Sequence, residues 1–300
     1  MLSFVFRSLT TMLVGLCMLH AHAAIVVKDD TGQEVRLKQP AQRIVSLAPH
    51  ITEVLFAAGA GDRVVGTVSY SDYPQAAKSI ALVGTYTQFD LEAIVALKPD
   101  LIIGWFSGNL PASIDKLRRL GLPVFLSQPD HIEDVARTLE QFGRLGGSEV
   151  VANMAAQRFR ERHAQLKNRY ANRPPVDVFY EVWNQPLMTV NGRQIISDIL
   201  RLCGARNVFA ELPTLAPQVT EESVLAANPE AIIASGMGEA RPEWLEQWKH
   251  WPQLIAVARD NLFFVPPQLI QRHTPRMLDG AERVCADIET ARTRRKKPTP

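Results

Sequence analysis

The chain has 300 residues, of which 46% are hydrophobic and 21% charged, and its formal net charge is +2 at pH 7. This composition is that of an ordinary globular protein, and the length is sufficient for two domains with cores of their own. Five of the cations crowd into residues 291–300, which carry no acid. That pattern is more typical of a short, disordered and solvated basic tail than of a nucleic-acid site, and we expect no nucleic-acid partner.

Residues 1–23 form a separate segment with one cation (Arg7), no acid, an apolar run over residues 12–19 and a small-residue ending at Ala23. These features predict a secretory signal peptide that is cleaved after Ala23. The apolar run is too short to span a bilayer, so we expect no stable membrane insertion. Leu16 is too bulky for the usual lipoprotein cleavage site before Cys17, which argues against lipidation.

The mature chain keeps two cysteines, Cys203 and Cys285. An even pair in an oxidising compartment predicts one disulfide within the second half of the chain, and two buried free thiols are the alternative. Neither cysteine has a second ligand at C-x-x-C or C-x-x-H spacing. We therefore expect no metal site at this pair.

Strand-like and helix-like segments alternate over residues 24–147. The chain opens with a predicted hairpin over residues 25–37. Short apolar runs then predict strands at residues 44–47, 64–67, 101–104 and 124–126. This alternation predicts an N-terminal α/β lobe with a mostly parallel sheet. Residues 148–172 contain no glycine or proline, and their apolar residues recur at helical spacing, which predicts one long connecting helix.

Residues 173–290 repeat the alternation and predict a C-terminal α/β lobe. Its expected strands include residues 176–180 and 262–265, and its expected helices include residues 195–203 and 275–291. The predicted fold class is therefore α/β, with two lobes of mostly parallel sheet joined by one long helix. A single stiff connecting helix favours a small hinge motion over a wide closure of the lobes.

One pattern occurs twice, over residues 90–103 and residues 220–233. Each copy has a capping residue, a glutamate two places further on, an apolar helix, a proline that stops the helix and an apolar strand. The glutamates are Glu92 and Glu222. For each glutamate taken singly, a favourable place at a helix N-terminus is the alternative explanation, but a matched pair on two like lobes points to function.

Aromatic residues gather in the loops that follow the predicted strands, where ligands of open α/β sheets bind. They include Tyr70, Tyr86, Trp105 and Trp183, and Arg272 follows the last strand. Flat amphipathic rings are suited to stack on a large planar ligand, although some of them would only pack between the lobes.

His50 follows the first strand and is a candidate ligand of a metal or cofactor, with a capping or solvated histidine as the alternative. The other histidines lack metal-site spacing, so no protein-bound metal is expected. The chain has no G-x-S-x-G, no H-E-x-x-H and no phosphate-binding glycine loop, and we therefore expect a binding protein and not an enzyme. A periplasmic enzyme or signalling protein on the same scaffold is the alternative of a different class.

Four segments carry a family resemblance: R-I-V-S-L-A-P-H-I-T-E-V-L-F-A-A-G, S-Y-S-D-Y-P, D-L-E-A-I-V-A-L-K-P-D-L-I-I-G-W and C-G-A-R-N-V-F. With them the mature chain resembles the periplasmic substrate-binding proteins of ABC importers for cobalamin and iron chelates. The resemblance implies a monomeric periplasmic receptor that holds a small molecule in a cleft between its lobes and delivers it to a two-subunit permease. It also implies that Glu92 and Glu222 dock on the permease and that Cys203 pairs with Cys285.

The resemblance further implies a corrinoid pocket formed by Tyr70, Tyr86, Trp105 and Arg272. The chain departs from the cobalamin-binding pattern at three positions, where it has Met188 for phenylalanine, Ala216 for tryptophan and Gln268 for aspartate. The expected ligand is cobalamin or a related corrinoid. Haem or a ferric siderophore is the alternative, favoured if Met188 and His50 line the cleft near an iron.

Overall fold

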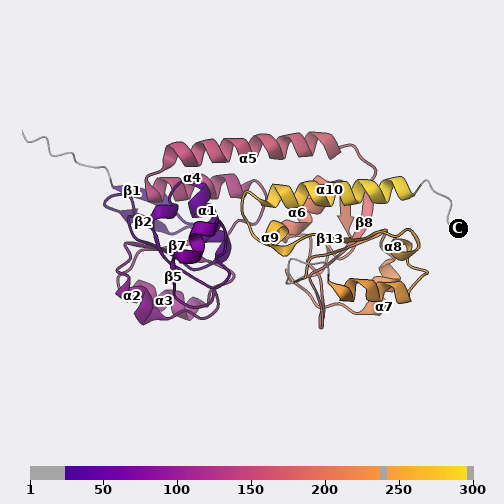
Figure 1. Cartoon of the computed structure of the whole chain (residues 1–300), viewed down its shortest axis with the longest axis horizontal. Helices are drawn as coiled ribbons and strands as arrows, with labels where there is room; N and C mark the ends of the chain where they lie inside the picture. Colours follow the sequence, from indigo (N-terminus) through magenta and orange to yellow (C-terminus); the bar gives the residue numbers. More distant parts are fainter. Residues whose placement is uncertain (1–23, 237–241, 296–300) are drawn as a thin grey trace, which may run out of the picture.

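The computed structural model describes residues 24–236 and 242–295 (Figure 1). The predicted signal peptide and the last five residues of the predicted tail lie outside the described residues. Two α/β lobes lie side by side, and the long helix α5 (Glu149–Tyr170) runs above both of them. The predicted fold class, two α/β lobes joined by one long helix, is confirmed.

The N-terminal lobe contains a five-stranded parallel sheet with the strand order β5-β4-β3-β6-β7. Its central strands are buried except at half-buried Trp105, the last residue of one of them, which explains why they form continuous apolar runs in the sequence. An antiparallel hairpin precedes the sheet, as predicted. The strands are β1 (Ile25–Lys28), β2 (Glu34–Leu37), β3 (Ile44–Ser46), β4 (Val64–Thr67), β5 (Ala81–Leu82), β6 (Leu101–Trp105) and β7 (Val124–Ser127). The helices are α1 (Pro49–Ala57), η1 (Gly61–Arg63), η2 (Gln75–Ser79), α2 (Leu91–Ala96), α3 (Pro111–Arg119) and α4 (Asp134–Gly146).

The C-terminal lobe contains a four-stranded parallel sheet with the order β11-β8-β12-β13 and a short separate hairpin, β9-β10. Its strands are β8 (Val176–Glu181), β9 (Trp183–Asn184), β10 (Leu187–Met188), β11 (Ala205–Asn207), β12 (Ala231–Ala234) and β13 (Leu262–Phe264). Its helices are α6 (Ile195–Leu202), α7 (Glu221–Ala227), η3 (Glu243–His250), α8 (Ile255–Ala258), α9 (Pro267–Ile270) and α10 (Met277–Arg294). None of the described helices combines the length and apolar character needed to cross a bilayer.

The repeated sequence pattern forms equivalent parts of the two lobes. The Asp90 carboxylate accepts a hydrogen bond from the N–H of Ala93 at 3.0 Å, and the Thr220 hydroxyl accepts one from the N–H of Ser223 at 3.2 Å. The helices that these residues cap, α2 and α7, lead into β6 and β12, which are both interior strands of their sheets. Local capping and the proline stops therefore define the same helix-turn-strand unit twice.

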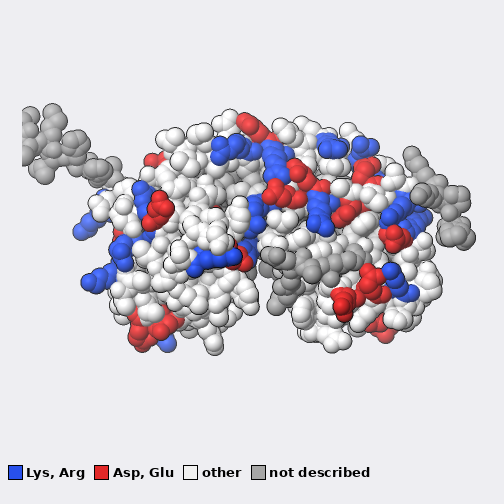
Figure 2. Space-filling model, in the orientation of Figure 1, with Lys and Arg blue, Asp and Glu red and all other residues white. Residues whose placement is uncertain are grey.

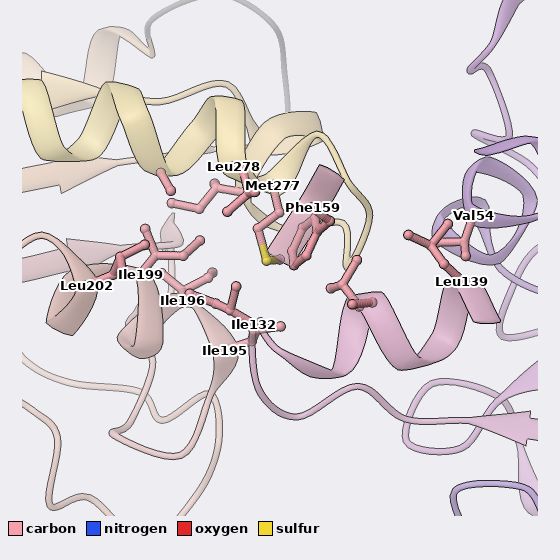
Figure 3. Packing of buried hydrophobic residues seen from close by; sticks show 14 of the residues in the cluster. Val54, Ile132, Leu139, Phe159, Ile195, Ile196, Ile199, Leu202, Met277 and Leu278 are labelled. Carbon is pink, nitrogen blue, oxygen red and sulfur yellow. The ribbon is translucent and has the colours of Figure 1, made fainter. Parts of the chain in front are cut away.

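One apolar cluster runs without interruption from the N-terminal lobe to the C-terminal lobe (Figure 3). It includes Val54 and Leu139 of the first lobe, Phe159 of α5 and Met277 of α10. A wide separation of the lobes would expose this shared apolar surface to water, which is unfavourable. The packing thus restricts the lobes to small relative motions.

The predicted disulfide is confirmed, since the Cys203 and Cys285 sulfurs are joined at 2.01 Å. One expectation is corrected. The predicted disordered tail does not begin at residue 291, because α10 continues to Arg294, and the guanidinium of Arg292 donates hydrogen bonds to the carbonyls of Pro174 and Cys203 at 2.7 Å.

Candidate functional site

The loops after β3, β4, β6 and β13 meet between the lobes. Figure 2 shows the surface indented there, on the side away from α5. Arg272, which follows β13, donates hydrogen bonds to the Asp72 carboxylate at 2.6 Å and to the Tyr70 carbonyl at 3.1 Å, across the two lobes. The carboxyl ends of parallel strands form the ligand-binding edge in open α/β sheets. This inter-lobe surface is therefore the candidate site.

A second arginine forms a closer bridge between the lobes. Arg276 donates two hydrogen bonds to the Glu53 carboxylate, each at 2.7 Å, and its guanidinium lies 3.7 Å from the centre of the Tyr73 ring. The Glu53 side chain is only 3% exposed, and Arg272 lies 3.9 Å from it. We call Glu53, Asp72, Arg272 and Arg276 the inter-lobe ion cluster.

Pairing within the cluster shifts the pKa values of Asp72 and Arg276. Partial burial acts to raise the pKa of Asp72, but the hydrogen bond and the charge of Arg272 outweigh it and hold that pKa below its ordinary value. The hydrogen bond from Arg276 to Glu53 raises the pKa of Arg276. The cluster thus joins the two lobes by pairing two carboxylates of the N-terminal lobe with two guanidinium groups of the C-terminal lobe.

An aromatic group lies beside the ion cluster. The ring centres of Tyr86 and Trp105 are 5.9 Å apart, and those of His50 and Trp105 are 5.2 Å apart, edge to face. Buried Asn109 positions this group, because its side chain accepts a hydrogen bond from the Trp105 N–H at 2.6 Å and donates one to the Tyr86 carbonyl at 2.7 Å. His273 of the C-terminal lobe completes the group, 6.2 Å from Trp105.

His50 is neither a helix cap nor a solvated side chain, so the alternative interpretation of this residue is wrong. The N-cap of α1 is Ala48, and His50 is 6% exposed. Burial lowers the pKa of His50 well below 6.5, with the nearby His273 and Arg272 adding to the effect. Burial likewise lowers the pKa of His273 to about 4. Both imidazoles are therefore neutral near pH 7.

The structure places the residues that were expected to bind ligand at two locations. Tyr70, Tyr86, Trp105 and His50 lie on the N-terminal side of the inter-lobe surface, and Arg272 reaches Tyr70 from the other lobe. Trp183 and Met188 face each other as a cross-strand pair on the β9-β10 hairpin of the C-terminal lobe. Tyr70 is 75% exposed, which leaves its ring free to contact a ligand.

Sequence reasoning gave no role to four residues of this surface: Glu53, Asp72, Asn109 and Arg276. The sequence held one indication for Glu53: it is the acidic residue of the apolar helix α1, and a carboxylate that is buried in such a helix needs a partner of opposite charge. The candidate partners Arg272 and Arg276 stand four places apart after the last strand. Their pairing with Glu53 became visible only with the arrangement of the lobes.

Glu92 and Glu222 are exposed in the first turns of α2 and α7. Both helices lie on the side of the molecule opposite α5, one on each lobe (Figure 1), and acidic side chains gather over them (Figure 2). Hydrogen bonds from its own N–H and from Thr220 lower the pKa of Glu222. The two lobes thus present one acidic helix start each on a common side.

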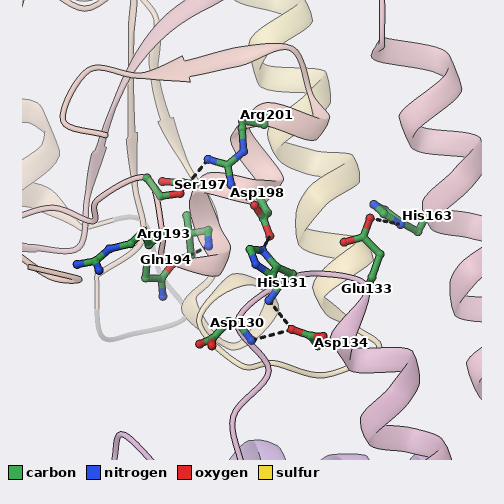
Figure 4. Close-up of polar contacts among 12 residues, drawn as sticks. Asp130, His131, Glu133, Asp134, His163, Arg193, Gln194, Ser197, Asp198 and Arg201 are labelled. Carbon is green, nitrogen blue, oxygen red and sulfur yellow. Dashed lines mark hydrogen bonds and ion pairs between the residues drawn. The ribbon is translucent and has the colours of Figure 1, made fainter. Parts of the chain in front are cut away.

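A groove of about 400 Å³ lies on the other side of the lobe junction, between α4, α5 and α6. There the His131 ring of the first lobe meets the Asp198 carboxylate of α6 at 2.9 Å (Figure 4). The hydrogen bond and the charge of Asp198 raise the pKa of His131. Within the described ranges no group of three or more His, Cys, Asp or Glu side chains is placed to hold a metal ion, here or elsewhere.

The family described as periplasmic binding protein matches the chain over residues 44–269. The chain is 37% identical over 253 residues to the vitamin B12-binding protein of Vibrio cholerae serotype O1, which covers 84% of this chain and 91% of that protein. It is 35% identical over 257 residues to the vitamin B12-binding protein of Yersinia pestis, with coverage of 85% and 89%.

Solved structures agree with these sequence relationships. The crystal structure of the periplasmic vitamin B12 binding protein BtuF of Vibrio cholerae superposes with a TM-score of 0.78 at 35% identity, covering 86% of this chain and 99% of that one. The haem-binding protein RhuT from Roseiflexus sp. RS-1 superposes with a TM-score of 0.72 at 19% identity, covering 84% and 99%, and thus shares the fold. The chain belongs to the periplasmic binding protein family.

Proposed function

We propose that this protein is the periplasmic receptor of an ABC importer, which captures cobalamin or a related corrinoid between its lobes and delivers it to the permease. The observation that carries the proposal is the similarity to vitamin B12-binding proteins over 84% of the chain. The inter-lobe surface supports it with exposed rings and an arginine at the ligand-binding edge of the sheets.

In this proposal Tyr70, Tyr86 and Trp105 contact the ligand from the N-terminal lobe, where flat rings cover a large planar macrocycle by stacking. Arg272 donates hydrogen bonds to acceptor groups at the periphery of the ligand, since its position beside Asp72 and Tyr70 already places it at the edge of the surface. Trp183 and Met188 contact the ligand from the C-terminal lobe. The protein performs no chemistry on the ligand.

Residues 1–23 serve as the signal peptide in this proposal, and the disulfide between Cys203 and Cys285 suits an oxidising compartment. The mature protein acts as a monomer. Calorimetric titration with cyanocobalamin tests the ligand, with hemin and a ferric hydroxamate siderophore titrated in parallel. We expect tight one-to-one binding of cyanocobalamin.

Binding of hemin or the ferric siderophore without any heat from cyanocobalamin would contradict the corrinoid assignment and leave an iron-chelate receptor. One observation favours this second candidate: the buried histidines His50 and His273 lie beside the aromatic group. Turnover of any of the three ligands would contradict the proposal of a pure binding protein.

Glu92 and Glu222 are proposed to dock on the two permease subunits, one glutamate to each. Two exposed acids on pseudo-equivalent lobes match a partner with two like halves, and such charges orient docking. We predict that Glu92→Arg with Glu222→Arg abolishes transport in cells and leaves ligand affinity unchanged.

The matched control for this charge reversal is Glu149→Arg. Glu149 is also exposed in the first turn of a helix, but its helix, α5, lies on the opposite side of the molecule (Figure 1). The control should transport normally. Normal transport by the Glu92/Glu222 double variant would show that these glutamates do not dock on the permease.

A further inference from the structure

Two consecutive residues of the C-terminal lobe, Arg272 and His273, contact the face of the N-terminal lobe that is proposed to bind the ligand. The Arg272 guanidinium donates hydrogen bonds to the Asp72 carboxylate at 2.6 Å and to the Tyr70 carbonyl at 3.1 Å. The His273 ring centre lies 6.2 Å from that of Trp105. Tyr70 and Trp105 are two of the proposed ligand contacts. A ligand that binds on them must therefore displace contacts between the lobes.

The two arginine bridges of the inter-lobe ion cluster differ in their exposure to water. The Glu53 side chain, which pairs with Arg276, is 3% exposed. The Asp72 side chain, which pairs with Arg272, is 48% exposed. Water competes for the charges of an exposed ion pair, so such a pair adds little stability and is easily broken. The pair of Asp72 and Arg272 is therefore the bridge that a ligand can break at low cost.

Breaking this pair does not leave Arg272 without a counter-charge. Its side chain is 16% exposed, and a charge so far removed from water needs a partner. The Glu53 carboxylate lies 3.9 Å from the Arg272 guanidinium and remains available when Asp72 is released. The guanidinium is rigid and planar, so the N–H groups that point at Asp72 and the Tyr70 carbonyl cannot point at an acceptor on a ligand at the same time. Arg272 must exchange one acceptor for the other.

We infer that Asp72 competes with the ligand for Arg272. The inference rests on the proposed function and deepens it, because it names a residue that sets the affinity of the site. Asp72 holds Arg272 on the N-terminal lobe, and the ligand gains the guanidinium only in the fraction of molecules in which this pair is broken. The apparent affinity is lower than the intrinsic affinity by that fraction. Removal of the Asp72 carboxylate should therefore tighten binding.

Calorimetric titration of the wild type and of Asp72→Ala with cyanocobalamin tests this inference. Cyanocobalamin carries no net charge, so a change in the charge of the protein does not by itself alter its attraction to the site. We expect Asp72→Ala to bind it about three- to fivefold more tightly, which is the range for the loss of one partly exposed ion pair. In an Arg272→Ala background the same substitution should leave the affinity unchanged, because the competition acts through the guanidinium.

Glu140→Ala is the matched control. Glu140 is 36% exposed at its side chain and pairs with Arg160 between α4 and α5, so this variant loses a comparable ion pair elsewhere and should bind like the wild type. Urea unfolding reports whether each variant is folded. An affinity of Asp72→Ala equal to or weaker than that of the wild type would overturn the inference and leave the proposed function intact. A gain that persists in the Arg272→Ala background would also overturn it, by showing that Asp72 acts without Arg272. Failure of the wild type to bind cyanocobalamin would overturn the corrinoid function and this inference with it.

Discussion

The ion pair between Glu53 and Arg276 should stabilise the closed arrangement of the lobes by an amount that can be measured. The pair joins residues 223 positions apart, and the two hydrogen bonds between them are 2.7 Å long. Glu53 is 3% exposed at its side chain and Arg276 20%. Substituting one partner therefore leaves the other largely buried without its counter-charge.

Breaking a buried ion pair at one partner typically costs about 3–5 kcal/mol. We expect the lower part of that range, about 3 kcal/mol, for Arg276→Met, because Arg276 keeps some solvent contact and Arg272 remains 3.9 Å from Glu53. Replacing both partners, Glu53→Leu with Arg276→Met, removes the stranded charge as well as the pair. The double variant should thus lie within about 1 kcal/mol of the wild type.

Urea unfolding at pH 7 of the wild type, both single variants and the double variant gives the coupling energy. Arg160 and Glu140 form a matched control, since this ion pair joins α5 to α4 but is 51% and 36% exposed at its side chains. Its coupling should stay below about 1 kcal/mol. Additive effects of Glu53→Leu and Arg276→Met, with a coupling below about 0.5 kcal/mol, would refute the argument that burial makes the inter-lobe pair strong.

Three further predictions concern pH and the disulfide. Burial raises the pKa of Glu181 to about 8, against 4.5 for an ordinary glutamate, so the unfolded state loses this proton at lower pH than the folded state. The free energy of unfolding should therefore fall as the pH rises from 4.5 to 8, by up to about 5 kcal/mol. Glu181→Gln should flatten this profile, and an unchanged slope would contradict the assignment. The hydrogen bond and charge of Asp198 raise the pKa of His131, so the stabilisation from this pair is fully present below pH 6.5 and is lost as the pH rises through the raised pKa. The thermal midpoint of the wild type should decline over that pH range, and the midpoint of His131→Asn should not. A parallel decline in the variant would exclude His131 as its source. The disulfide closes a loop with a sequence separation of 82, so Cys203→Ser with Cys285→Ser should lower the free energy of unfolding, measured by urea unfolding, by about 4 kcal/mol. A change below about 1 kcal/mol would show that the packing of α6 on α10 stabilises this region without the disulfide.

Much of the fold was predictable because its signals are local. Buried parallel strands are short continuous apolar runs, and helices begin at capping residues and end at glycine or proline. The repeated unit is an example: Asp90 and Thr220 cap α2 and α7 through hydrogen bonds to residues three places along the chain. The pairing of Cys203 with Cys285 was predictable for a different reason, since no other cysteine remains after the signal segment.

The C-terminal end shows where local signals misled. Residues 291–295 have the composition of a solvated basic tail, and composition alone predicts disorder there. In the fold, Arg292 donates hydrogen bonds to the carbonyls of Pro174, just before β8, and Cys203, just before β11. Arg295 pairs with Glu230. These partners lie far away in sequence, so the extension of α10 depends on tertiary contacts.

The candidate site divides in the same way. The sequence by itself determined that aromatic residues and an arginine follow the strands of both lobes, because strand ends and loop composition are read from consecutive residues. Only the tertiary structure decided that Glu53 pairs with Arg276, that Asp72 pairs with Arg272 and that His50 is buried against His273. The physical reason is that charge pairing and burial depend on distances across the junction of the lobes, and those distances are set by how the two cores pack beneath α5.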